Sequence, residues 1–171
     1  EKDIVNLRLY FMVGLPTEED EDIDAIIDLV KKIQHTALSR TRGKKKFRRI
    51  TLSINQFIPK PRTPLQWLPL ADVRAVGARI KKISGAFCRD KQIKVIADVP
   101  KWNYVQAILA LGDRRVSDIL LAVHRLDGNW MRALKDVNVN ADFYVYRQKR
   151  LDEILPWDVI ETGVSKKYLI R

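Results

Sequence analysis

The sequence predicts an α/β fold with a parallel sheet, followed by a helical C-terminal region. Two strand patterns flank a helical pattern, and the right-handed crossover of such a β-α-β unit makes its strands parallel. After Pro100 helical spacing dominates. The chain has 171 residues, the size of one ordinary domain or of a domain with an appendage. We therefore place a soft boundary near residues 98–101, between a domain over residues 1–98 and a helical region over residues 99–171.

The first predicted strand is LRLYFMV, residues 7–13, an almost continuous apolar run that ends at Gly14. Such a run is typical of a parallel strand that is buried on both faces. A helix of roughly four to five turns should follow, because apolar residues recur at helical spacing from Ile23 to Ile33. Thr17 and Asp20 at its start resemble a capping box.

The second predicted strand is ITLSINQFI, residues 50–58, in which apolar and polar side chains alternate and β-branched residues are frequent. Residues 59–69 contain four of the seven prolines, so this segment should be extended and stiff. Helical spacing follows over residues 70–87, and a third strand pattern covers residues 93–97. Further helix patterns lie at residues 102–111, 116–123, 130–134 and 143–151.

Composition excludes several classes of protein. Apolar residues form 46% of the chain and charged residues 31%, which fits neither a disordered chain nor a coiled coil. We expect a cytoplasmic protein, because no run approaches the ~20 apolar residues of a membrane span and no secretory leader is visible. Cys88, His35 and His124 are too few to bind zinc or an iron–sulfur cluster. The start without Met, close to the first strand, suggests a piece of a longer protein.

The turn GLPTE, residues 14–18, is the most informative feature of the chain. In parallel α/β folds, ligands bind beyond the carboxyl ends of the strands, and a glycine there lets the backbone approach a ligand closely. A tight turn before a capped helix would use the same residues. The pattern alone favours neither interpretation.

Four segments in order resemble the radical S-adenosylmethionine (radical SAM) enzymes. LYFMVGLPTEEDEDIDAIIDLV, residues 9–30, resembles their fifth strand and helix, and NQFIPKPRTPLQW, residues 55–67, resembles their sixth strand and its exit loop. Residues 112–125 and 154–169 resemble the C-terminal part of a subgroup that often carries an upstream cobalamin-binding-like domain. The resemblance implies the C-terminal portion of a partial TIM-like (βα)6 barrel with a helical C-terminal extension.

The resemblance also implies cofactors. Members of the family hold a [4Fe–4S] cluster on a CxxxCxxC loop, and its unique iron binds S-adenosylmethionine, which is cleaved reductively to a 5′-deoxyadenosyl radical. This chain has no such loop. We therefore expect the cluster to belong to a missing N-terminal half of the same protein. We expect the chain alone to bind neither cofactor and to be inactive, and we assign it no catalytic or metal-binding residue.

By the same resemblance, residues at the ends of the first two strands contact the adenosyl group: Met12, Gly14, Glu18, Asn55, Gln56, Phe57 and Ile58. Core packing is the alternative for the apolar residues among them, and hydrogen bonding to nearby backbone is the alternative for the two amides. Lys60, Arg62 and Trp67 extend from the proline segment, where a cation and an indole could close over an anionic or flat substrate. We favour the alternative that this segment is a structural cover.

The net charge of +11 favours an anionic partner, and residues 40–49 hold seven basic side chains. The alternative function is therefore a basic, non-catalytic nucleic-acid-binding module that depends on Lys44, Lys45 and Lys46. The segment contains one aromatic residue, Phe47, and no stacking platform for single-stranded RNA. A scaffold segment without a ligand is a third, weaker alternative.

The open sheet edge of a half-fold also predicts self-association or a partner chain. The substrate cannot be read from the sequence, and no membrane partner is expected.

Overall fold

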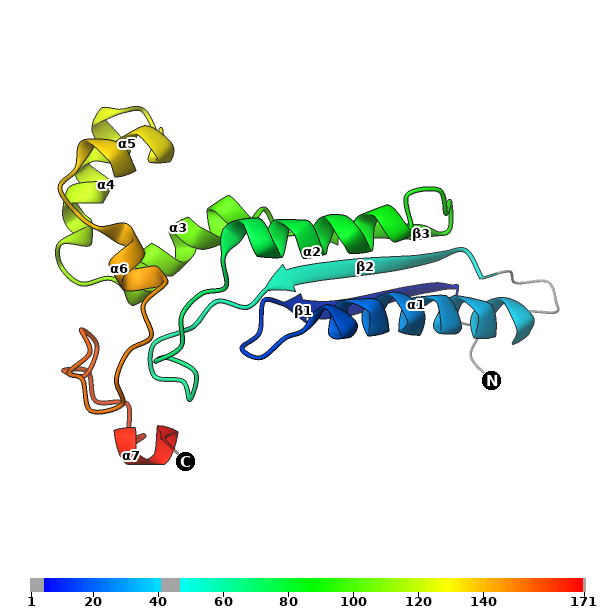
Figure 1. Ribbon diagram of the computed structural model, residues 1–171, viewed down its shortest axis with the longest axis horizontal. Coiled ribbons are helices and arrows are strands. Elements are labelled where there is room, and N and C mark those ends of the chain that lie inside the picture. The colour runs from blue at the N-terminus through cyan, green and yellow to red at the C-terminus, as the bar shows by residue number, and fades with distance from the viewer. Residues whose placement is uncertain (1–4, 41–46, 171) are drawn as a thin grey trace. The chain divides into compact units, whose positions relative to one another are not determined.

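The computed structural model describes residues 5–40 and 47–170 (Figure 1). Lys44, Lys45 and Lys46, on which the nucleic-acid alternative depends, lie outside the described residues. The elements are, in order, β1 (Asn6–Val13), α1 (Asp20–Arg40), β2 (Arg49–Gln56), α2 (Val73–Ala86), β3 (Ile93–Ala97), α3 (Pro100–Leu111), α4 (Val116–Arg125), α5 (Trp130–Asp136), α6 (Ala141–Val145) and α7 (Lys166–Leu169). None of the described helices combines the length and the apolar character that a membrane span requires.

The chain divides into two compact units. The sheet unit consists of Glu1–Phe57 and Asp72–Pro100, and the helical unit consists of Ile58–Ala71 and Lys101–Arg171. Each unit has its own core, so each is described by itself below.

The sheet unit contains one three-stranded parallel sheet in the order β1-β2-β3 (Figure 1). Leu9 pairs with Leu52, and Leu52 pairs with Val95, so the three strands are in register along their length. The predicted strands and their parallel pairing are confirmed. Successive right-handed crossovers in one direction place both connecting helices on the same face of the sheet, and α1 and α2 indeed contact each other.

The helix-covered face holds the core of the sheet unit. Apolar side chains at alternate positions of β2 interlock with the apolar stripes of α1 and α2, which is the packing that the helical spacing predicts. The fully buried members are Val13, Ile23, Val30, Ile50, Leu52, Ile54, Val76 and Ile83.

The other face of the sheet is open in the described structure. Along β1, exposed side chains alternate with less exposed ones, so Tyr10 is 69% and Met12 50% exposed. The prediction that this strand is buried on both faces is therefore wrong, because the described helices cover only one face. This open face also carries Arg49 and Lys94, both exposed.

The prediction of a TIM-like (βα)6 barrel portion is wrong. The described strands form a small open sheet in which β1 and β3 are both edges. A barrel requires strands that pair on both sides and close the sheet upon itself, and three strands in the order of the sequence do not do this. The structure is a small α/β fold with a three-stranded parallel sheet and seven helices among the described residues.

The helical unit is built around two apolar clusters. The larger one joins α3, α4, α5 and α6 through residues such as Ile108, Ile119 and Ala133. Helices predicted over residues 102–111, 116–123 and 130–134 are confirmed. The helix predicted over residues 143–151 is wrong beyond Val145, where the chain turns back so that the Lys149 amide donates to the Trp67 carbonyl at 2.9 Å.

Candidate functional site

The turn between β1 and α1 has a strained backbone that its own acid stabilises. Gly14 has φ +78° and Thr17 has φ +64°, which lie in the left-handed region that glycine adopts at little cost. The Gly14 amide donates to Oε2 of Glu18 at 2.8 Å. The expected Thr17 cap is wrong, because the Thr17 hydroxyl donates to the Pro16 carbonyl instead, at 2.5 Å.

Arg79 of α2 holds Glu18 in place through hydrogen bonds to its side chain and its backbone. Its Nη1 donates to Glu18 Oε2 at 2.5 Å, and its Nη2 donates to the Glu18 carbonyl oxygen at 2.9 Å. The Glu18 side chain is only 5% exposed, and its carboxylate is oriented by the Gly14 amide and the Arg79 guanidinium. Sequence reasoning missed Arg79, because nothing near it in the chain points to a residue 61 positions earlier.

The carboxyl end of β2 lies beside that of β1. Asn55 pairs with Met12, and both side chains are exposed on the open face of the sheet. Asp98, which directly follows β3, accepts hydrogen bonds from Asn55 Nδ2 at 3.2 and 3.3 Å and from the Gln56 amide at 3.3 Å. The Asp98 amide donates to the Ile54 carbonyl at 3.0 Å. Sequence reasoning missed Asp98, although its position just after a parallel strand was a usable signal.

The remaining adenosyl candidates have other surroundings. The side chains of Gln56 and Phe57 are buried in the sheet unit, and the Phe57 amide donates to the Val13 carbonyl at 2.8 Å. Ile58 packs against the larger apolar cluster of the helical unit. Of the seven adenosyl candidates, the structure therefore brings Met12 and Asn55 together on the open face. It leaves Gly14 and Glu18 in the adjoining turn.

The proline segment is anchored inside the helical unit. Trp67 is 2% exposed and packs in the smaller apolar cluster with Leu111, Leu155, Trp157 and Leu169. The Arg62 guanidinium donates to the Ile160 carbonyl. Lys60 is half-buried. This arrangement supports the structural-cover alternative for the three substrate-side candidates.

Gln66, in the same segment, is 1% exposed and joins two parts of the helical unit. Its Oε1 accepts from the Arg62 amide at 2.9 Å and from Trp157 Nε1 at 2.6 Å. Sequence reasoning did not single out Gln66, because only the fold brings Trp157 to it.

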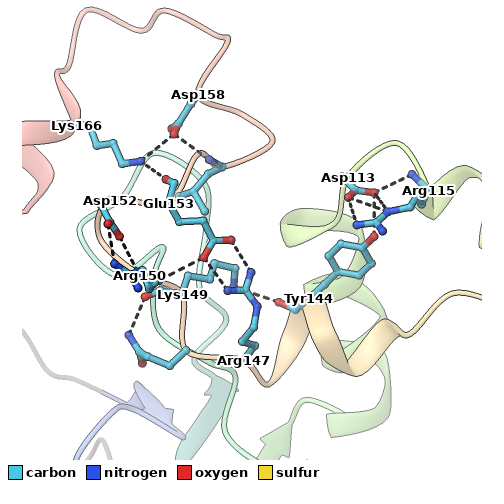
Figure 2. Close-up of polar contacts among 12 residues, drawn as sticks. Asp113, Arg115, Tyr144, Arg147, Lys149, Arg150, Asp152, Glu153, Asp158 and Lys166 are labelled. Carbon is cyan, nitrogen blue, oxygen red and sulfur yellow. Dashed lines mark hydrogen bonds and ion pairs between the residues drawn. The ribbon is translucent and has the colours of Figure 1, made fainter.

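Figure 2 shows a second polar cluster, also in the helical unit. The Arg115 guanidinium donates to both carboxylate oxygens of Asp113 at 2.6 to 3.1 Å and holds the pKa of that carboxyl well below its usual range. The Tyr144 hydroxyl donates to Asp113 Oδ1 at 2.9 Å. Arg115 and Tyr144 line a cavity of about 220 Å³, together with Asn138 and Phe143.

The other end of this cluster surrounds Lys149 (Figure 2). The Arg147 guanidinium forms a bidentate ion pair with the Glu153 carboxylate, with hydrogen bonds of 2.6 and 2.7 Å. Lys149 is buried, and its ammonium donates to the Tyr144 carbonyl at 3.1 Å. Burial, followed by the nearby Arg147 charge, lowers the pKa of Lys149 to about 8.

The described residues do not fit an iron–sulfur cluster or another metal centre. Among residues 5–40 and 47–170, no group of three His, Cys, Asp or Glu side chains could hold a metal ion. Cys88 is exposed and follows α2, at the opposite end of the sheet unit from Gly14.

Comparison with known proteins gives one curated relative. The chain is 36% identical over 117 residues to the uncharacterized protein MJ0966 of Methanocaldococcus jannaschii. The match covers 68% of this chain but only 23% of that protein. No family model matches the sequence, and no solved structure matches it.

Proposed function

We propose that this chain is part of a radical SAM enzyme and that the carboxyl ends of β1 and β2 form one wall of its adenosyl pocket. The observation that carries the proposal is the hydrogen bond from the Gly14 amide to the Glu18 carboxylate, which stabilises the turn at the carboxyl end of a parallel strand. Ligands of parallel α/β folds bind at these ends. The ordered resemblance of four separate segments to the radical SAM family supports the same function.

Each residue has a defined task in this proposal. Met12 offers a half-exposed apolar side chain for the flat adenine, and the Asn55 amide beside it offers a polar contact. Asp98 orients Asn55 through two hydrogen bonds. Glu18 and Arg79 are positioning residues, because they contact the turn and each other. S-adenosylmethionine, when bound next to a reduced cluster, supplies a 5′-deoxyadenosyl radical that abstracts hydrogen from a substrate.

The cluster would be held by another part of the full-length protein. The described residues lack a fitting set of ligands, so no step of the proposal assigns the cluster to them. The exposed edge of β1 would pair with that missing part, since an unpaired parallel strand invites a further strand.

The proposal is tested on the parent protein with its natural upstream sequence. After anaerobic reconstitution with iron and sulfide, reductant and S-adenosylmethionine are added, and 5′-deoxyadenosine is measured by chromatography. We expect Glu18→Gln to reduce its formation at least about tenfold, because the turn loses its charged anchor. Glu19→Gln, a neighbouring exposed acid, is the matched control. A parent sequence without a CxxxCxxC motif, or a parent protein that forms no 5′-deoxyadenosine, would contradict the proposal.

A further inference from the structure

A large hollow lies at the end of the sheet unit opposite to the proposed adenosyl wall. It has a volume of about 470 Å³ and adjoins the start of β2, the end of α2 and the edge strand β3. Cations from separate segments line it: Arg49 at the start of β2, Lys91 in the turn before β3, and Lys94 in β3. Neither the radical SAM resemblance nor the proposed adenosyl wall gives this hollow a role.

The cations of the hollow are available to a ligand. Arg49, Lys91 and Lys94 are exposed, and within the described ranges none of them has an ion-pair partner. Asp90 is the acid in the lining, and both of its oxygens are used: Oδ2 accepts from Gln34 Nε2 at 2.7 Å, and Oδ1 accepts from the Gln92 amide at 2.8 Å. The hollow therefore presents excess positive charge.

Charge within the sheet unit is separated between its two ends. The acidic first turn of α1, Asp20 to Asp22, follows the carboxyl end of β1. Arg48 and Arg89 are exposed and lie at the opposite end, next in sequence to residues that line the hollow. Such separation attracts an anion to the cationic end and repels it from the other.

The open face of the sheet carries an exposed aromatic side chain beside a row that contains two of its cations. Arg8, Thr51 and Lys94 form one row across the three strands. Tyr10 begins the next row, is 69% exposed, and has the Arg8 guanidinium 5.7 Å from its ring centroid. A base can stack on such an exposed ring next to cations that contact the backbone of a strand.

We propose that the open face of the sheet and this hollow bind a single-stranded nucleic acid. Phosphates contact Arg49, Lys91 and Lys94, and a base stacks on Tyr10. The hollow, at about 470 Å³, is large for a single small anion, and its three cations suit successive phosphates of a strand. The inference uses residues other than those of the adenosyl proposal: Arg49, Lys91 and Lys94 lie at the opposite end of the sheet, and Tyr10 lies in the row before Met12.

The affinity test uses fluorescence anisotropy of the whole chain with a labelled RNA and a labelled DNA single strand of about twelve nucleotides. The double variant Lys91→Gln/Lys94→Gln is compared with Lys135→Gln/Lys167→Gln, two exposed lysines of the helical unit. We expect the first pair to weaken binding at least about tenfold more than the second at low salt. It should also reduce the slope of log affinity against log salt by about 1.4, or about 0.7 for each lost phosphate contact.

The stacking part is tested with Tyr10→Ser against Tyr168→Ser, since these two tyrosines are 69% and 67% exposed. We expect Tyr10→Ser to weaken binding roughly fivefold or more and Tyr168→Ser to leave it unchanged. The proposal is overturned if the unaltered chain binds neither strand, or if either variant binds like its control. Inorganic triphosphate is also tested as a competitor, at the same phosphate concentration as unlabelled oligonucleotide. If triphosphate displaces the labelled strand as effectively as the oligonucleotide does, the proposal is overturned.

Cys88 provides an independent footprint. It is the chain's one cysteine, it is exposed, and it lines the hollow. A bound strand should slow its modification by a maleimide severalfold at saturating oligonucleotide. An unchanged labelling rate under conditions where anisotropy shows full binding would place the strand elsewhere and overturn the proposal.

Discussion

Arg79 and Glu18 are joined by two hydrogen bonds that connect α2 to the turn after β1. One runs from Nη1 to the carboxylate at 2.5 Å and the other from Nη2 to the carbonyl oxygen at 2.9 Å. The same carboxylate accepts the Gly14 amide. The conformation of this turn therefore depends on a helix that is formed much later in the chain.

Replacing Arg79 should destabilise the sheet unit. Arg79→Met leaves the mostly buried Glu18 carboxylate without its cation, which should lower the free energy of unfolding by about 2–4 kcal/mol. The measurement is urea unfolding followed by circular dichroism. Arg74→Met, an exposed position of the same helix, should change stability by less than about 0.5 kcal/mol. Equal losses in both variants would show that the pair with Glu18 contributes nothing specific.

The sequence could predict the strands and the Gly14 turn but not what surrounds them. Local patterns predict a strand, because apolar residues either alternate with polar ones or follow one another over a short stretch of sequence. The partners Arg79 and Asp98 could not be assigned, since their contacts depend on how separate elements pack. The buried Glu18 was identified by resemblance, whereas its hydrogen bonds come from the structure alone.

The errors in the predicted fold also have physical reasons. The apolar run over residues 7–13 suggested burial on both faces, yet Tyr10 and Met12 are exposed because both helices cover the opposite face. A resemblance of strands to those of a barrel does not supply the strands that would close one. Trp67 could be read from sequence as a ligand contact, but its indole packs in the core of the helical unit.

Gln66 should be the most sensitive polar residue of the proline segment. Gln66→Met keeps about the same side-chain volume but leaves the part-buried Arg62 amide and the buried Trp157 indole N–H without their acceptor. We expect a loss of about 2–4 kcal/mol of unfolding free energy, measured by urea titration with tryptophan fluorescence. Gln106→Met, at an exposed position of α3, is the control and should be nearly neutral. A neutral Gln66→Met would mean that water or another group accepts these hydrogens.

Lys149 should make stability rise with pH above about 8. Burial lowers its pKa from 10.5 to about 8 in the folded chain. Between about pH 8 and 10.5 Lys149 is therefore mostly protonated in the unfolded chain and mostly neutral in the folded chain. Because the unfolded chain binds more protons in this range, the free energy of unfolding increases as the pH rises. The gain is at most about 3 kcal/mol, at 1.36 kcal/mol per pKa unit. Urea unfolding at pH 7 and 9.5 should show about 2 kcal/mol of this gain. Lys149→Met should remove most of it, and Lys135→Met, at an exposed site, should retain it. The same pH dependence in all three proteins would contradict the assignment.

The backbone of β1 shows which of its groups are available to a further strand. The Val5 and Val13 carbonyls accept from the amides of Arg48 and Phe57, on the side of β2. Backbone groups alternate in direction along a strand, so the amide of Arg8 points to the free edge. A proline at this position removes an outward donor and leaves the pairing with β2 intact.

Self-association through this edge therefore has a specific test. We expect sedimentation velocity of the unaltered chain to show association that grows with concentration, since an exposed parallel edge pairs readily with another strand. Arg8→Pro should weaken the association, whereas Arg8→Ala, which removes the same side chain and keeps the amide, should not. If both variants weaken it equally, the Arg8 side chain rather than the strand edge makes the contact. A monomer at all concentrations would show that the edge does not pair with a second copy of this chain.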